Sequence, residues 1–135
     1  RRINDNMGAN IAKDVIKLMA QHQLPIYQAR ALVLGLTFKE NCPDIRNSKV
    51  VDVIRELMSF GIQVDVYDPH AETEEVRHEY DLELAAKPNG KYHAIILAVS
   101  HEEFAALPLD TLKEPNGVVY DVKGFLNKSQ ITARL

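Results

Sequence analysis

Apolar residues recur along the chain with periods that predict alternating helices and strands. Near the start they are spaced mostly four residues apart, which places on one helix face Ile3, Met7, Ile11, Val15, Leu18 and Met19. Pro25 ends this pattern, because its ring cannot continue a helix. We interpret the segment as the end of a longer helix; the alternative is a complete N-terminal helix. The apolar run at 31–36 then predicts a strand buried on both faces of a parallel sheet.

Three more strands and two more helices follow. The strands are predicted at 62–67, 92–99 and 118–121, the helices at 48–60 and 72–80, and a turn at 116–117. Asn47 or Ser48 is expected to cap the first of these helices, and Gly61 to follow its last turn. Ser100 and Glu103 have the spacing of a capping box after the third strand.

Strands that alternate with helices indicate an α/β fold, here a three-layer Rossmann-like sandwich with a mostly parallel sheet in the order 2-1-3-4. In such sheets, ligands bind beyond the carboxyl ends of the strands, where the strand order reverses. The residues expected at that edge are Phe38-Lys39, Asp68, Ser100-His101 and Asp121 to Lys123.

The loop after the first strand lacks the glycines of a dinucleotide site. That site needs the pattern G-x-G-x-x-G, so that the backbone can approach a pyrophosphate, but only Gly35 is present. Asp68 stands where a ribose-binding acid would lie, which without the glycines is a weak signal. A small NAD-binding domain is therefore disfavoured.

Cations instead gather in this loop. Two interpretations fit them about equally: a phosphate site beside a helix N-terminus, or a solvated loop whose cations are neutralised by Glu40 and Asp44. Phe38 directly precedes the first of these cations, and we favour core packing over stacking on a ligand as its role. The residues concerned are Phe38, Lys39, Arg46 and Lys49, with Lys123 expected to face the same crevice from the fourth strand.

Composition narrows the classes of function. The 16 Lys and Arg against 19 Asp and Glu give a net charge of -3, which argues against a nucleic-acid-binding domain. A single cysteine, Cys42, excludes a disulfide scaffold, and we expect an ordinary free thiol. The histidines show no metal-ligand spacing, and no apolar run is long enough to span a membrane. No signal peptide is visible, so we expect a cytoplasmic protein.

Several sequence motifs of this chain occur in the same order in one enzyme family, which the chain resembles. Residues 33–48 read VLGLTFKENCPDIRNS, followed by YDP at 67–69 and YDVK at 120–123, while RRIND at 1–5 matches the end of a long central helix. Together they resemble the C-terminal domain of the UDP-glucose/GDP-mannose 6-dehydrogenases. The form of the first motif is similar to the branch that oxidises UDP-N-acetylhexosamines for capsular or O-antigen polysaccharides in bacteria.

The resemblance implies a three-part enzyme. Residues 1–24 would end the central, dimerising helix, and 25–135 would form a Rossmann-like domain that binds the UDP-sugar. NAD would be bound mainly by an N-terminal domain outside this chain, and the whole enzyme would be a homodimer or larger. Its reaction takes C6 from alcohol to carboxylate in two oxidations through a thiohemiacetal and a thioester on a catalytic cysteine, which also lies outside the chain. The chain alone would be inactive.

Roles follow only for matching positions. Phe38 and Lys39 match the substrate-contacting pair, and Lys123 stands where many members have an arginine that contacts the nucleotide sugar. Arg46 matches an arginine that reaches toward NAD across a domain or subunit boundary. Cys42 does not match the nucleophile. The alternative from a different class is a free-standing α/β regulatory or interaction module without a catalytic role.

Overall fold

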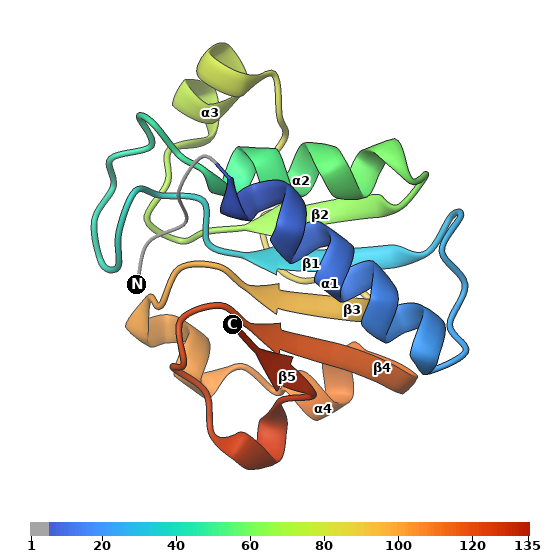
Figure 1. Ribbon diagram of the computed structural model, residues 1–135. Coiled ribbons are helices and arrows are strands. Elements are labelled where there is room, and N and C mark those ends of the chain that lie inside the picture. Colours follow the sequence, from blue (N-terminus) through green and yellow to red (C-terminus); the bar gives the residue numbers. More distant parts are fainter. Residues whose placement is uncertain (1–5) are drawn as a thin grey trace.

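A five-stranded parallel sheet forms the centre of the computed structural model, which describes residues 6–135 (Figure 1). Its strands lie in the order β2-β1-β3-β4-β5, and every neighbouring pair is parallel. They span Arg30–Leu34 (β1), Gln63–Tyr67 (β2), Tyr92–Leu97 (β3), Lys113–Asp121 (β4) and Ala133–Arg134 (β5). The predicted α/β class and the order 2-1-3-4 are confirmed, and β5 is an addition that the sequence analysis missed.

Two helices cover one face of the sheet. These are α1 (Met7–Gln21) and α2 (Val50–Ser59), which pack side by side on it (Figure 1). Their apolar stripes close over one cluster of buried residues, to which the sheet contributes Ala31, Val33, Ala94 and Ile96. The N-terminal helix is thus part of this core, while Ile3 of its predicted stripe lies outside the described residues.

Shorter elements cover the opposite face. The 3-10 helix η1 (Glu102–Ala106) and α4 (Leu109–Leu112) bury Phe104 and Leu109 against Leu32, Leu34 and Ile95. A second 3-10 turn, η2 (Lys128–Gln130), precedes β5, and α3 (Thr73–Tyr80) stands beyond the β2 edge (Figure 1). The alternating faces of the strands therefore feed two separate cores, as a three-layer sandwich requires.

Several predicted ends of elements are wrong. Helix α2 begins at Val50 with Lys49 as its N-cap residue, because the hydroxyl of Ser48 donates instead to the carbonyl of Leu36 at 2.6 Å. The expected box at Ser100 is not formed; His101 is the N-cap residue of η1 and makes no side-chain cap. Strand β4 begins at Lys113, earlier than predicted, and the predicted turn at 116–117 is a local interruption of its pairing with β3, where Asn116 has a φ of 65°. Gly61 does follow α2, with a φ of 82°.

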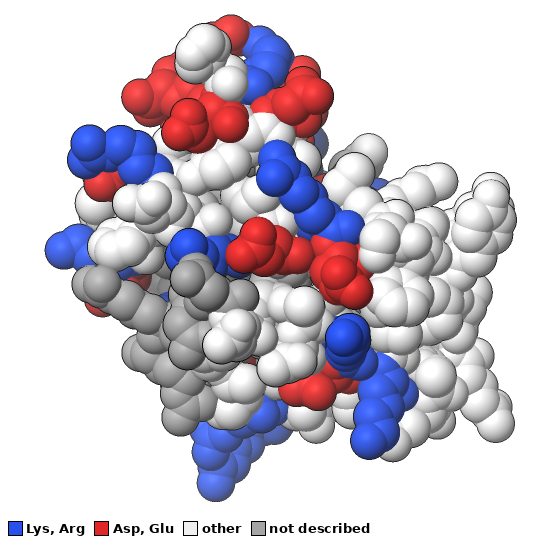
Figure 2. Space-filling model, turned by 45° about the horizontal axis from the view of Figure 1, so that its top comes forward, with Lys and Arg blue, Asp and Glu red and all other residues white. Residues whose placement is uncertain are grey.

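Charged side chains are unevenly distributed over the surface. Acidic groups gather over α3, whereas the end at which α1 and α2 finish is uncharged (Figure 2). That end contains the charge-free runs 18–29 and 57–64, with Tyr27, Met58 and Phe60 exposed. No helix within residues 6–135 combines the length and apolar character needed to cross a membrane.

Candidate functional site

The carboxyl ends of β1 and β3 meet at the reversal of strand order, and a hollow opens there. We call it the switch-point hollow; its lining consists of Thr37, Phe38, Asn47, Ser48, Lys49, Val50, Ala98, Val99 and Lys123. Its walls are the β1–α2 loop, the first turn of α2, the segment after β3 and the turn after β4. The position is the one at which open α/β sheets bind ligands.

Gly35 allows the two central strands to end this close together. It has a φ of 100°, and a Cβ atom at this position would lie 2.5 Å from the Cβ of Val99. Any side chain would therefore push the β1–α2 loop away from the segment after β3. The one glycine of this loop therefore allows the backbone to pack against Val99, and it is not there to let the backbone approach a phosphate.

The side chain of Asp68 points into the protein and accepts hydrogen bonds from backbone N–H groups of the β1–α2 loop. Its Oδ2 accepts from the N–H groups of Leu36 at 2.7 Å and Thr37 at 3.0 Å, and its side chain is wholly buried. These donors are among those that a dinucleotide-binding loop would offer to a pyrophosphate. A protein carboxylate occupies them, so this loop does not fit an NAD pyrophosphate.

Hydrogen bonds keep this buried carboxylate ionised. Burial alone would raise the pKa of Asp68, but the bond from His101 and those from the N–H groups of Leu36 and Thr37 outweigh it. The pKa of Asp68 therefore lies below its ordinary range.

His101 completes this buried cluster. It is 0% exposed, and its Nε2 lies 3.0 Å from both Asp68 Oδ2 and the hydroxyl of Thr37. Its Nδ1 accepts from the N–H of Asn41 at 2.8 Å. The sequence analysis placed His101 near the crevice but assigned it no role. The available signal was a histidine in the segment after the third strand, at the same edge of the sheet as an aspartate directly after the second.

Asp121 orders the turn that carries Lys123. Its Oδ1 accepts from the N–H groups of Lys123 and Gly124, both at 2.9 Å, and its Oδ2 from that of Leu126 at 2.7 Å. The residue is 0% exposed. The turn after β4 is thereby fixed, and it brings Lys123 to the hollow that Lys49 also lines.

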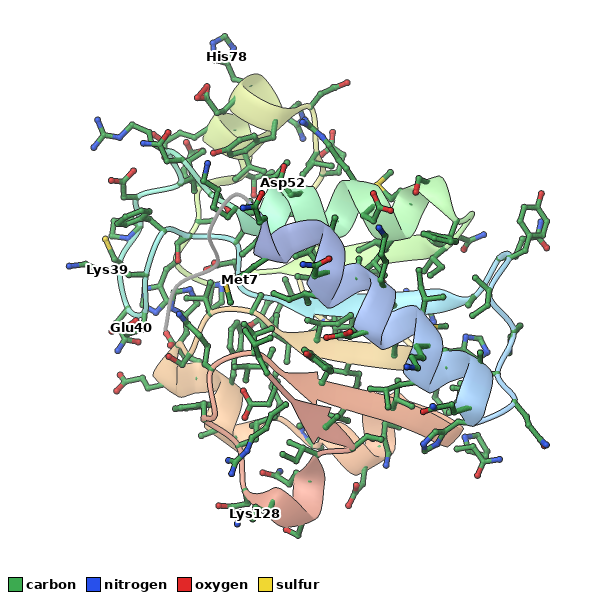
Figure 3. All side chains as sticks on the ribbon, in the orientation of Figure 1. Met7, Lys39, Glu40, Asp52, His78 and Lys128 are labelled. Carbon is green, nitrogen blue, oxygen red and sulfur yellow. The ribbon has the colours of Figure 1, made fainter. Side chains whose placement is uncertain are left out.

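The predicted site residues separate into two groups. Phe38 is 37% exposed and belongs to neither buried cluster, so the core packing expected for it is wrong. Phe38 and Lys123 line the switch-point hollow. Lys39 is exposed on the outer edge of the β1–α2 loop, pointing away from the sheet (Figure 3). Arg46 lines an adjoining hollow with Phe38, Asp44 and Asn47.

Arg46 is paired on the surface. Its side chain is 80% exposed, and its Nε and one terminal nitrogen donate to the two carboxylate oxygens of Asp44 at 3.0 and 3.1 Å. The pair lowers the pKa of Asp44 and raises that of Arg46. Neutralisation by acidic neighbours thus holds for this arginine, and the pKa of Glu40 is lowered by a backbone hydrogen bond and by the nearby cations of Lys123 and Lys39. Lys49 and Lys123 also line the hollow, so both interpretations of the loop apply in part.

Known proteins resemble this chain along its whole length. The UDP-N-acetyl-D-glucosamine 6-dehydrogenase of Pseudomonas aeruginosa is 43% identical over 139 residues, which cover 100% of this chain and 33% of that enzyme. Protein CapL of Staphylococcus aureus is 40% identical, covering 97% of this chain and 32% of its own length. The chain thus spans about a third of these relatives.

Solved structures share the fold. The UDP-D-ManNAc dehydrogenase of Pyrococcus horikoshii has a TM-score of 0.78 at 19% identity, over 97% of this chain and 31% of that one. The NDP-N-acetyl-D-galactosaminuronic acid dehydrogenase of Methanosarcina mazei Go1 has a TM-score of 0.80 at 17% identity, over 94% and 27%. The profile of the UDP-glucose/GDP-mannose dehydrogenase family, UDP binding domain, matches residues 32–128. The chain therefore belongs to the UDP-glucose/GDP-mannose dehydrogenase family and carries its UDP binding domain.

Proposed function

We propose that this chain binds the UDP part of a UDP-sugar within a longer NAD-dependent 6-dehydrogenase. The observation that carries the proposal is the switch-point hollow, where Lys49, Lys123 and the exposed ring of Phe38 line one cavity. Lysine ammonium groups suit a diphosphate, and an exposed aromatic ring offers a stacking surface to a base. Lys39, on the rim of the same loop, would add a further contact through its flexible side chain.

The proposed substrate class is a UDP-N-acetylhexosamine, oxidised at C6 to the uronic acid for polysaccharide synthesis. Its support is the naming of two relatives, from Pseudomonas aeruginosa and Salmonella typhi, as UDP-N-acetyl-D-glucosamine 6-dehydrogenases at 43% and 39% identity. Holding the remote UDP group orients the sugar, because binding energy from a non-reacting part can be used at the reacting carbon.

We assign NAD and the nucleophilic cysteine to the remainder of the longer protein. The β1–α2 loop does not fit the cofactor's pyrophosphate, because Asp68 holds its N–H groups. Arg46 remains the candidate for a contact with NAD; its 80% exposed side chain supports this, and the contact would replace its pair with Asp44. Residues 1–24 would end the dimerising helix and 25–135 form the UDP domain of a cytoplasmic homodimer or larger assembly.

The test uses the longer protein that carries this chain. We expect it to oxidise UDP-N-acetylglucosamine with two molecules of NADH formed per sugar, followed by absorbance, and to use UDP-glucose less efficiently. Absence of NADH formation with every UDP-sugar tested would favour the alternative, a regulatory or interaction module.

A further inference from the structure

One imidazole holds both ends of the segment that contains Phe38 and Lys39. His101 Nε2 lies 3.0 Å from the hydroxyl of Thr37, and its Nδ1 accepts the N–H of Asn41 at 2.8 Å. The five residues 37–41 therefore form a short arch whose two feet rest on one side chain. Asn41 has a left-handed backbone (φ 57°), and its side-chain oxygen accepts the N–H of Glu102 at 3.1 Å.

The hydrogen bonds fix the tautomer of this ring. Because a backbone N–H points at Nδ1, that nitrogen carries no proton, and the proton of the neutral ring is on Nε2. Nε2–H then donates toward Asp68 Oδ2 and the Thr37 hydroxyl, which in turn donates to the carbonyl of Lys39 at 3.1 Å. Every polar atom of the ring is used to hold this loop or its buried anchor.

Rigid surroundings hold the ring itself. His101 follows β3, and its ring centroid lies 4.4 Å from that of His70 and 5.4 Å from that of Phe104. Asp68 joins it to the end of β2. The imidazole thus fixes a loop without regular structure to the segments that follow β2 and β3.

We propose that His101 is a positioning residue that pre-orders the arch 37–41, so that Phe38 is presented to the nucleotide in its binding geometry and the backbone of Lys39 is held at the rim of the hollow. The proposal rests on the proposed function. His101 is absent from the lining of the switch-point hollow, so it would act through the arch and not by touching the ligand. Pre-ordering matters because a free loop would lose conformational entropy on binding.

The test compares His101→Leu, which removes both ring nitrogens, with Phe104→Leu, which disturbs the packing of the same ring but removes no hydrogen bond. UDP binding to the chain is measured by calorimetry, and amide exchange at Asn41 by NMR. We expect His101→Leu to weaken UDP binding about tenfold or more and to accelerate exchange at Asn41. Phe104→Leu should lower the melting temperature while UDP binding stays within about twofold.

A third variant separates the two feet of the arch. In His101→Asn the side-chain oxygen approximates the position of Nδ1, so we expect protection of the Asn41 amide to be partly regained. Equal UDP affinity in wild type and His101→Leu, or an equal loss in Phe104→Leu, would overturn the positioning role. A wild-type chain that does not bind UDP would overturn the proposed function instead. In that case unchanged Asn41 exchange in His101→Leu would also refute the ordering of the arch.

Discussion

At the scale of single residues, Asp68 illustrates how hydrogen bonds offset the cost of burying a charge. Its side chain is removed from water, yet its oxygens accept from two loop N–H groups, from His101 and from the N–H of His70. Hydrogen bonds to a charged group each contribute about 1.5–3 kcal/mol. The carboxylate therefore anchors the loop of the candidate site without binding a ligand.

Asp68→Asn should destabilise the chain by about 2 kcal/mol at pH 7, because an amide replaces one acceptor oxygen with a donor. The folded-state pKa of Asp68 lies below its unfolded value of about 3.9. Its contribution to stability is therefore complete above about pH 4 and is lost as the pH falls through the folded-state pKa. Urea unfolding between pH 3 and 7 tests this. The exposed Asp110→Asn serves as the control, and an equal acid sensitivity of wild type and Asp68→Asn would contradict the assignment.

Lys39→Ala and Lys123→Ala should each raise the KM of the longer enzyme for its UDP-sugar about fivefold or more. Lys123 lines the hollow, and Lys39 would reach the diphosphate by turning its flexible side chain back from the outer edge of the loop. The KM for NAD should change less than twofold. Steady-state kinetics measure both KM values. Lys87→Ala is the matched control, because it also removes one lysine charge but lies before β3, at the opposite end of the strands. An unchanged sugar KM would remove that lysine from the site.

Cys42→Ser should leave activity near the wild-type value. The thiol is free and only partly exposed, and it does not match the family's nucleophile. The rate of NADH formation measures this. Complete loss of activity in a folded variant, checked by circular dichroism, would show that the thiol takes part in the chemistry.

At the scale of elements, the close approach of β1 and β3 decides the shape of the site. Their parallel ladder ends at the pair Leu34 and Leu97, and the chain then turns at Gly35 directly beside Val99. A second glycine, Gly124, follows β4 with a φ of 68°, but a Cβ atom added there would meet nothing within 4 Å beyond its chain neighbours. The two positions share positive φ and differ in the space around them.

Gly35→Ala should therefore cost about 3 kcal/mol or more, from backbone strain plus overpacking against Val99. Gly124→Ala should cost only about 1 kcal/mol, from strain alone. Denaturant unfolding of both variants separates the two terms. Equal destabilisation would mean that the steric contact at Val99 is relieved by small movements of the loop.

The sequence was sufficient for most elements because their apolar runs are long and regular. It was insufficient where tertiary contacts decide. Ser48 bonds to Leu36 rather than capping α2, and Asn116-Gly117 interrupts β4 rather than preceding it, because that strand already begins at Lys113. Strand β5 has two residues, too few for any periodicity.

The position of the candidate site was predictable from the sequence, but the directions and hydrogen bonds of its side chains were not. Strand ends gather at one edge of a parallel sheet, which placed Phe38, Asp68, His101 and Lys123 together in advance. Side-chain direction is not set by that rule. Asp68 and His101 therefore turn into the core, Lys39 turns outward, and only the structure distinguishes them from Phe38 and Lys123 at the hollow.

At the scale of the whole molecule, local charge and net charge differ in sign. The chain has a net charge of -3, with acidic groups gathered over α3 (Figure 2). Yet the switch-point hollow is lined by two lysines and by no acidic residue among its described lining. The lysines that line the hollow, rather than the overall charge, would therefore attract an anionic nucleotide.

The central claim, that this chain binds UDP and not NAD, is tested most directly by two NMR titrations of the chain. UDP should shift the amide resonances of Phe38, Lys39, Lys49 and Lys123, because these residues lie at or beside the hollow. NAD should leave them and the resonances of Gly35 and Asp68 unchanged. Shifts with NAD centred on Gly35 and Asp68, with none from UDP, would contradict the account and make this domain the cofactor site.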